Sequence, residues 1–271
     1  MTGHGIAGNL RRYYPKWISI AISFLMVFAN TINLGADIGA MGEAVHLVSH
    51  APAFLFAIGF ALLSVVLQIT VPYSRYASVL KWLTLTLFAY VAVVFSVKVP
   101  WAEALKGTLI PNISFSSNYL TTLIAILGTT ISPYLFFWQA SQEVEEVEIN
   151  AEEEPLKQAP EQASEQLARI RWDTYTGMAF SNIVAYFIIL TAGATLHAQG
   201  KTNIQSAAEA AQALQPIAGD FATLLFSLGI VGTGLLAVPV LAGSAAYALG
   251  ESLKLPTGLD QNPLEAKGFY A

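Results

Sequence analysis

A proline inside an apolar, helix-forming stretch is the first feature of the sequence that could do chemistry. Pro133 has no N–H for the carbonyl of Thr129, four residues back, so it frees that oxygen. It also disfavours the α conformation at Ser132, and Gly128 loosens the preceding turn. Broken helices of this kind build ion sites in many transporters. The run 128–134 therefore predicts a broken helix that offers an oxygen to an ion; the alternative is a simple kink in which hydroxyls bond back to carbonyls.

A second group of polar residues lies within the first apolar stretch. Asn30, Asn33 and Asp37 are spaced i, i+3 and i+7, which places them within about 60° of one another around a helix. An ionisable residue at membrane depth is a functional candidate, so we interpret Asp37 as part of a functional polar stripe; the alternative is a structural partner for Asn33 or for another helix. Three glycines predict a separate face for close helix packing: Gly35, Gly39 and Gly42.

The composition places these groups in a membrane. Of the 271 residues only 11% are charged (13 Lys and Arg, 18 Asp and Glu), against roughly 25% in soluble domains. Thirteen of these charges lie in residues 143–173, so long stretches elsewhere have none. A membrane-spanning helix needs about 20 mostly apolar residues. The sequence therefore predicts an all-α integral membrane protein.

Six spans are predicted, and a charged connector joins the fourth to the fifth. The last span is rich in small residues and contains Pro239, which favours either close packing or a proline hinge. The connector, 143–171, is interpreted as a solvated acidic loop in the cytosol. The predicted spans cover residues 15–47, 53–72, 76–97, 117–143, 172–197 and 221–250 of a single domain, 1–271.

The positive residues predict the orientation. With six spans, ten of the 13 Lys and Arg fall on the side of both termini and the acidic loop. The positive-inside rule places that side in the cytosol.

Several function classes are excluded on residue types. The chain has no cysteine, and no basic face that would suit nucleic acid. An intramembrane hydrolase would need an Asp pair, a Ser–His pair or a helical HExxH motif, and none is evident, so we expect no enzyme. We also expect no permanently bound cofactor.

Two runs resemble the NRAMP family of divalent metal transporters: residues 29–42 (ANTINLGADIGAMG) and residues 128–139 (GTTISPYLFFWQ). The run 239–246 (PVLAGSAA) and the order of the spans fit as well, and the chain looks like a divergent bacterial branch. The resemblance therefore implies a bacterial inner membrane. The resemblance implies a LeuT-like fold of two inverted repeats, with a metal site between two unwound helices. It matches this chain to family helices three to eight, an incomplete transporter whose missing helices belong to the same fold or to a partner chain.

The resemblance also implies roles for single residues. The Thr129 carbonyl becomes a metal ligand, and Ser132 takes the place of the family's methionine thioether ligand. Pro133 matches, Tyr134 stands where a histidine is usual, and Asp37 lies on the proposed proton path. A hydroxyl is a hard ligand and a thioether a soft one, so we expect weaker discrimination against Mg²⁺ than the family norm.

Two functions remain open at this stage. The first is transport of a divalent cation of the Mn, Fe or Mg class by alternating access, with proton symport as a further expectation. The second is a non-transporting membrane fragment or accessory subunit that needs a partner chain.

Overall fold

The computed structural model is built from helices, several of which begin directly after a proline and one after a serine that caps it. It describes residues 2–71, 75, 78, 81–82, 85–111, 113–149, 153–197, 200, 204, 207–215, 219–259, 261 and 266–270. In this part of the chain the helices are α1 (Ile6–Tyr13), α2 (Lys16–Ser49), α3 (Ala53–Thr70), α5 (Phe88–Ser96), α6 (Trp101–Leu109), α7 (Ser117–Thr130), α8 (Pro133–Ile149), α9 (Ala163–Thr195), α10 (Ala207–Ala211), α12 (Ala222–Leu253) and α13 (Lys267–Tyr270). Short 3-10 turns lie at Leu85–Leu87, Pro160–Gln162, Gln212–Leu214 and Gly219–Phe221. The predicted all-α fold is confirmed for these residues.

Five helical segments of the described residues are long and apolar enough to cross a membrane: α2, α3, α7 with α8, α9 and α12. A sixth is possible only if Leu85–Ser96 and Trp101–Leu109, which are bent by 119° at the break between them, act as one span. The predicted third span, 76–97, is not a straight helix here. Its described helix, α5, has nine residues, about 14 Å at 1.5 Å per residue, too short to cross alone. Positions 72–74, 76–77, 79–80 and 83–84 lie outside the described residues.

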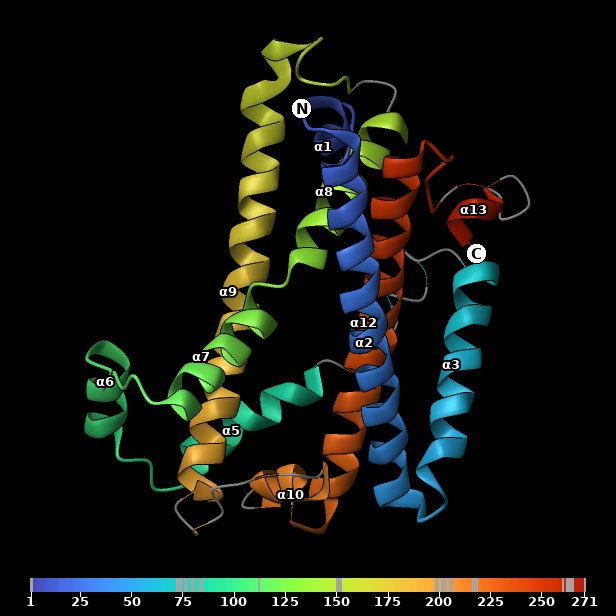
Figure 1. Ribbon diagram of the computed structural model, residues 1–271. Coiled ribbons are helices and arrows are strands. Elements are labelled where there is room, and N and C mark those ends of the chain that lie inside the picture. Colours follow the sequence, from blue (N-terminus) through green and yellow to red (C-terminus); the bar gives the residue numbers. More distant parts are fainter. Residues whose placement is uncertain are drawn as a thin grey trace.

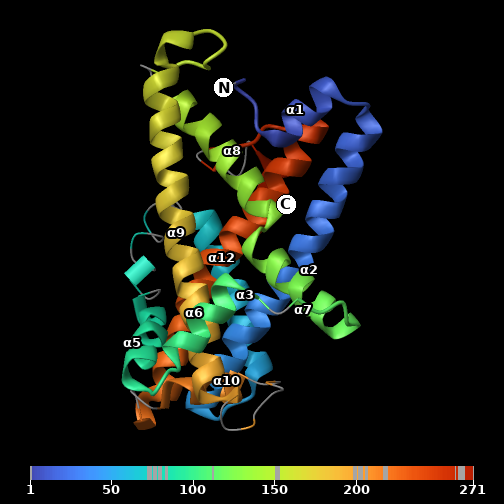
Figure 2. The same cartoon turned by 90° about the vertical axis from the view of Figure 1, so that its left-hand side faces the viewer.

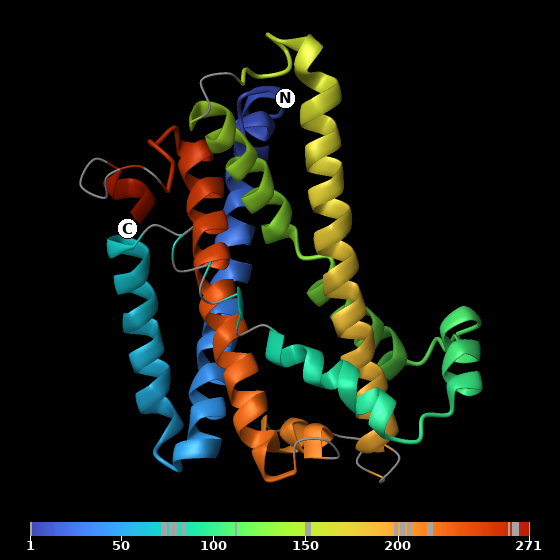
Figure 3. The same cartoon turned by 180° about the vertical axis from the view of Figure 1, so that it is seen from behind.

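The centre of the molecule is the pair α2 and α12, which lie side by side along most of their length (Figures 1 and 3). Half of the most apolar window of α12 is buried, against 6% for α3 and for α9. α3 packs on the outer side of α2, and α8 crosses α12 (Figure 2). α5 packs against α9 at the end of the molecule opposite the amino terminus (Figure 3). α8 is thus held against this two-helix centre, whereas α7, which precedes it, has no buried residue.

Hydrogen bonds between buried polar side chains join α2 to α12, and we call this contact the α2–α12 seam. The Asn30 amide donates to the Leu241 carbonyl and to the Ser244 hydroxyl, both at 2.8 Å. The Ser252 hydroxyl lies 2.9 Å from that of Ser19 and 2.7 Å from that of Ser23. Inside a membrane such bonds and close small-residue packing hold helices together, because lipid competes with apolar contacts.

Glycines decide how closely the helices approach, but not at every predicted position. A Cβ on Gly234 would lie 2.6 Å from Met41, which is fully buried, and one on Gly42 would lie 2.6 Å from the Ala53 carbonyl oxygen. Nothing lies within 4 Å of a Cβ built on Gly35 or on Gly39. The predicted packing face is therefore right at Gly42 alone. For the last span, close packing rather than a hinge describes α12, in which Pro239 is buried inside a continuous helix.

The connector between the fourth and fifth spans is more ordered than a solvated loop. α8 continues to Ile149, and α9 begins at Ala163 rather than near the predicted 172. Lys157 donates to the Tyr13 hydroxyl at 3.0 Å, and this bond lowers the pKa of Tyr13. Residues 150–152 lie outside the described part of the chain. Much of 143–171 is therefore helix.

Candidate functional site

The predicted broken helix is present between α7 and α8. α7 ends at Thr130 and α8 begins at Pro133, while Ile131 leaves the helical region with φ −117° and ψ 63°. Ile131 still donates its N–H to the Leu127 carbonyl at 2.9 Å, which closes α7. The chain passes through an extended step before α8 resumes the same apolar span (Figure 1). The geometry is that expected when a proline follows a residue disfavoured from the α region.

The hydroxyls at the break bond back to carbonyls of their own helix. The buried Ser132 hydroxyl donates to Thr129 O at 3.1 Å and to Gly128 O at 3.2 Å. Thr129 and Thr130 both donate to Ile126 O, at 2.9 and 2.8 Å. These are the bonds of the simple-kink interpretation. A carbonyl oxygen has two lone pairs, so Thr129 O, whose residue is exposed, keeps acceptor capacity for a cation.

Three predicted site residues come together where α8 meets α2. The ring of Tyr134, at the start of α8, packs against the cluster of Met26, Phe137 and Ala248. Its hydroxyl group interacts with Ser132 and lies within electrostatic range of Asp37. Tyr134 is thus the residue of α8 that interacts with both Ser132 at the break and Asp37 on α2.

Other predicted members of the polar stripe do not join this group. Asn30 is 2% exposed and belongs to the α2–α12 seam, whereas Asn33 is exposed on the surface of α2. Gly128 has open space around its Cβ position. Helical periodicity predicts Asn30 and Asp37 on nearby faces of α2. In the structure Asn30 belongs to the α2–α12 seam, whereas Asp37 lies within electrostatic range of Tyr134.

No ready-made cluster of acidic or imidazole ligands accompanies the break. Among the described residues, no group of three or more His, Cys, Asp and Glu lies together as a metal site would need. The predicted ligands are of another kind, a backbone carbonyl and a hydroxyl oxygen, which suit hard cations.

The sequence interpretation missed a set of polar contacts at the end of α8 nearer the amino terminus. Arg169 on α9 pairs with Glu143, 3.1 Å away, with Glu153 and with Glu146. Glu145 accepts hydrogen bonds from the Tyr247 hydroxyl at 2.5 Å and from Leu259 N–H at 2.8 Å. The sequence predicts a solvated acidic run. The i, i+3 spacing of Glu143 and Glu146, which places both on one helical face, is the signal that would have predicted a shared cation. These contacts tie α8 to α9 and to α12.

Comparison with known proteins identifies the relatives of this arrangement. The family model for natural resistance-associated macrophage protein-like proteins, Nramp, matches residues 1–270. The divalent metal cation transporter MntH of Vibrio campbellii is 23% identical over 248 residues, covering 87% of this chain and 53% of the relative. MntH of Xanthomonas campestris pv. campestris is 24% identical over 265 residues, covering 94% of this chain and 57% of the relative.

A third relative, MntH of Yersinia pestis, is 28% identical over 130 residues, which cover 48% of this chain and 29% of the relative. The chain spans about half the length of the first two relatives. The family resemblance of the two sequence runs is thereby confirmed. Because the Nramp model matches nearly all of its residues, the chain belongs to the natural resistance-associated macrophage protein-like family.

Proposed function

We propose that this chain forms part of a divalent metal cation transporter, with the metal ion as its substrate. The observation that carries the proposal is the helix break at 131–132, in a chain whose relatives bear the name divalent metal cation transporter. Thr129 O and the Ser132 hydroxyl are the proposed ligands from this chain. Broken helices supply such oxygens to ions within membranes because the freed backbone groups need polar partners.

Two oxygen ligands do not complete a coordination shell. Divalent cations of the Mg²⁺ type take about six oxygen ligands, some of them water. We therefore propose that further helices of the same fold, or a partner chain, cover the exposed side of the break. The exposure of Ile124 and Leu127 on α7 and of Ile131 at the break supports this, since these side chains are 68%, 47% and 55% exposed.

Ser132 leads to a proposal about selectivity. Its hydroxyl stands where the family resemblance expects a soft thioether, so the site favours hard cations more than its relatives do. The test is Mn²⁺ uptake into liposomes containing the complete gene product, with increasing Mg²⁺ outside. We expect Mg²⁺ to compete in the natural protein and to compete about tenfold less in Ser132→Met.

The matched control is Thr121→Met, which adds a thioether to the exposed side of α7 away from the break. It should leave the competition by Mg²⁺ unchanged. Full rejection of excess Mg²⁺ by the natural protein would contradict the proposed ligand set. A protein that neither binds nor moves Mn²⁺ would favour the accessory-subunit function.

Asp37 is the proposed proton relay of this transporter. It lies on α2 within electrostatic range of Tyr134, beside the break, so a proton on its carboxylate would respond to a cation there. Mn²⁺ uptake should be faster with an inward proton gradient, and Asp37→Asn should remove this acceleration. Glu43→Gln, an exposed neutralisation on the same helix, is the control. If the proton gradient still accelerates Mn²⁺ uptake in Asp37→Asn, then Asp37 is not the proton relay.

The proposed orientation has both termini in the cytosol. Because the chain has no cysteine, single cysteines at Thr2 and at Leu109 can report it by labelling with an impermeant thiol reagent in whole cells. We expect labelling at Leu109→Cys alone. Labelling at Thr2→Cys alone would mean that the orientation is the opposite of the proposed one.

A further inference from the structure

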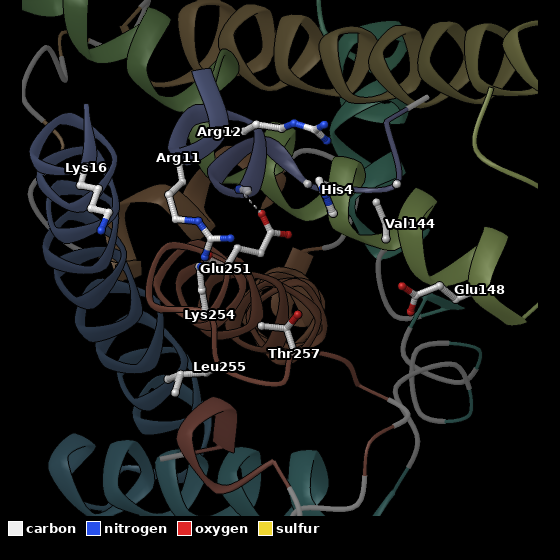
Figure 4. A pocket seen from close by; sticks show the side chains of 13 residues that line it. His4, Arg11, Arg12, Lys16, Val144, Glu148, Glu251, Lys254, Leu255 and Thr257 are labelled. Atoms are coloured by element: carbon white, nitrogen blue, oxygen red, sulfur yellow. Dashed lines mark hydrogen bonds between the residues drawn. The ribbon is translucent and has the colours of Figure 1, made fainter. Parts of the chain in front are cut away.

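A basic cavity lies at the amino-terminal end of the two central helices. It has a volume of about 560 Å³ and is enclosed by α1, the first turn of α2, α8 and the end of α12 (Figure 4). Four cations line it: Arg11, Arg12, Lys16 and Lys254. The acidic residues in the lining are Glu148 and Glu251, so the formal charge of the lining is positive.

The fold brings these cations together from three separate elements. The apolar side of α1 packs through Ala7 against α2, α8 and α12, which leaves Arg11 and Arg12 at the cavity. α2 begins at Lys16, directly after Pro15. α12 ends at Leu253, and the next residue, Lys254, adopts the left-handed conformation with φ 62°.

The left-handed position at Lys254 is usually taken by glycine, because a Cβ there is strained. Here it is a lysine, and its N–H and that of Leu255 both bond to the Gly250 carbonyl. This turn ends α12, and the Lys254 side chain lies in the lining of the cavity (Figure 4).

Of the two acids in the lining, the carboxylate of Glu251 is already engaged by groups other than these cations. Glu251 accepts a hydrogen bond from Gly8 N–H at 2.6 Å and one from the Ser141 hydroxyl at 3.2 Å. Gly5 and Gly8 allow this approach, since a Cβ on Gly5 would collide with the Glu251 carboxylate. Arg11 donates one hydrogen bond, to the backbone oxygen of Glu251 at 2.7 Å, out of the five N–H groups of a guanidinium.

The two lysines at this cavity lack an internal partner. Within the described part of the chain, no acceptor is within hydrogen-bonding distance of the Lys16 or Lys254 side chain. The lining of the cavity therefore contains two ammonium groups and the spare donors of a guanidinium. This donor set matches a phosphate group.

We propose that this cavity binds the headgroup phosphate of an anionic phospholipid. The cavity lies at the ends of two membrane spans, where headgroups are found. Trp17, 71% exposed, and Leu253, 49% exposed, stand beside it and can contact acyl chains. Basic pockets between membrane helices bind anionic headgroups in this way. Lipid bound there would join α1, α2 and α12, and this holds whether or not the chain transports metal.

The experiment measures lipid binding to the purified full chain by native mass spectrometry. The probes are short-chain phosphatidylglycerol, phosphatidylcholine of the same chain length, and inorganic phosphate. We expect saturable binding of phosphatidylglycerol, little binding of phosphatidylcholine, and no displacement by millimolar phosphate. Lys16→Gln with Lys254→Gln should weaken the binding of phosphatidylglycerol by about thirtyfold.

The matched control is Arg171→Gln with Lys267→Gln, which removes two exposed cations that do not line the cavity. It should leave the affinity unchanged. An equal loss in the control would mean general attraction to basic residues and would overturn the proposal. Displacement of the lipid by inorganic phosphate at millimolar concentration would overturn the lipid as the source of the phosphate group. Thermal unfolding of each variant without lipid checks that the fold is intact.

Discussion

The α2–α12 seam and the break between α7 and α8 both place polar side chains in apolar helices, but they give them different partners. At the seam, Asn30 donates to a carbonyl and a hydroxyl of the other helix, and every atom involved is buried. At the break, Ser132 donates only to carbonyls of its own helix, and Thr129 beside it is exposed.

This difference separates stability from function. A bond across two helices fixes their register and is lost only if the helices part. A bond from a hydroxyl to its own helix fixes a local kink and leaves the carbonyl with a second lone pair. We infer that the seam is the scaffold and that the break is the part available to a ligand. Substitutions in the two regions should therefore affect different measurements.

The largest effect is expected from overpacking the seam. Gly234→Leu would place side-chain atoms where Met41 lies, and Met41 is fully buried, so it has no space to move into. We expect a loss of about 3 kcal/mol in the free energy of unfolding. SDS titration of the purified protein, followed by circular dichroism, measures it. Gly35→Leu, with open space around its Cβ, is the control and should change the value little.

The contrast between these glycines shows what the sequence could and could not predict. Spacing along α2 gives the angle of each residue around its own axis, and it predicted Gly35, Gly39 and Gly42 as one packing face. Which part of that face meets a neighbour depends on where α3 and α12 lie, and only Gly42 is in contact. For the same reason, Asn30 was grouped with Asp37, although it belongs to the seam.

The helix ends were predicted better where prolines and caps mark them. α2 begins after Pro15, α3 after Pro52, and α8 at Pro133, as the local sequence requires. The connector was predicted less well, because its glutamates were read as solvated charges. Their pairing with Arg169 depends on α9 lying beside α8, which no local pattern contains.

The second-largest effect on stability is expected from removing the Asn30 amide at the seam. Asn30→Ala removes two hydrogen bonds of 2.8 Å and leaves a cavity between α2 and α12, so we expect a loss of about 2 kcal/mol in the free energy of unfolding. Asn33→Ala is matched in chemistry but exposed, and should cost much less. The same SDS titration measures both. Equal losses would mean that the seam does not depend on Asn30.

The third change is expected to alter Mn²⁺ uptake rather than the free energy of unfolding. Pro133→Ala restores an N–H that can bond to Thr129 O, which would make α7 and α8 continuous. The same bond would occupy Thr129 O, the proposed metal ligand. Mn²⁺ uptake by the reconstituted protein should fall about fivefold, which corresponds to about 1 kcal/mol, with no loss of stability. Pro52→Ala, at the start of α3, is the control. Unchanged uptake in Pro133→Ala would separate transport from the break.

The smallest effect is expected at Ser132, whose single O–H is shared between two carbonyls, whereas the Asn30 amide has an N–H for each of its two acceptors. Its hydroxyl donates to Thr129 O and Gly128 O at 3.1 and 3.2 Å, and both carbonyls lie on exposed residues of the same helix. Ser132→Ala should therefore lower the free energy of unfolding by about 0.5 kcal/mol, near the mean for hydrogen bonds between membrane helices. SDS titration beside Asn30→Ala gives the ratio directly. A loss at Ser132 as large as that at Asn30 would mean that the break is itself part of the scaffold, because a hydroxyl serving only a local kink has no second helix to hold.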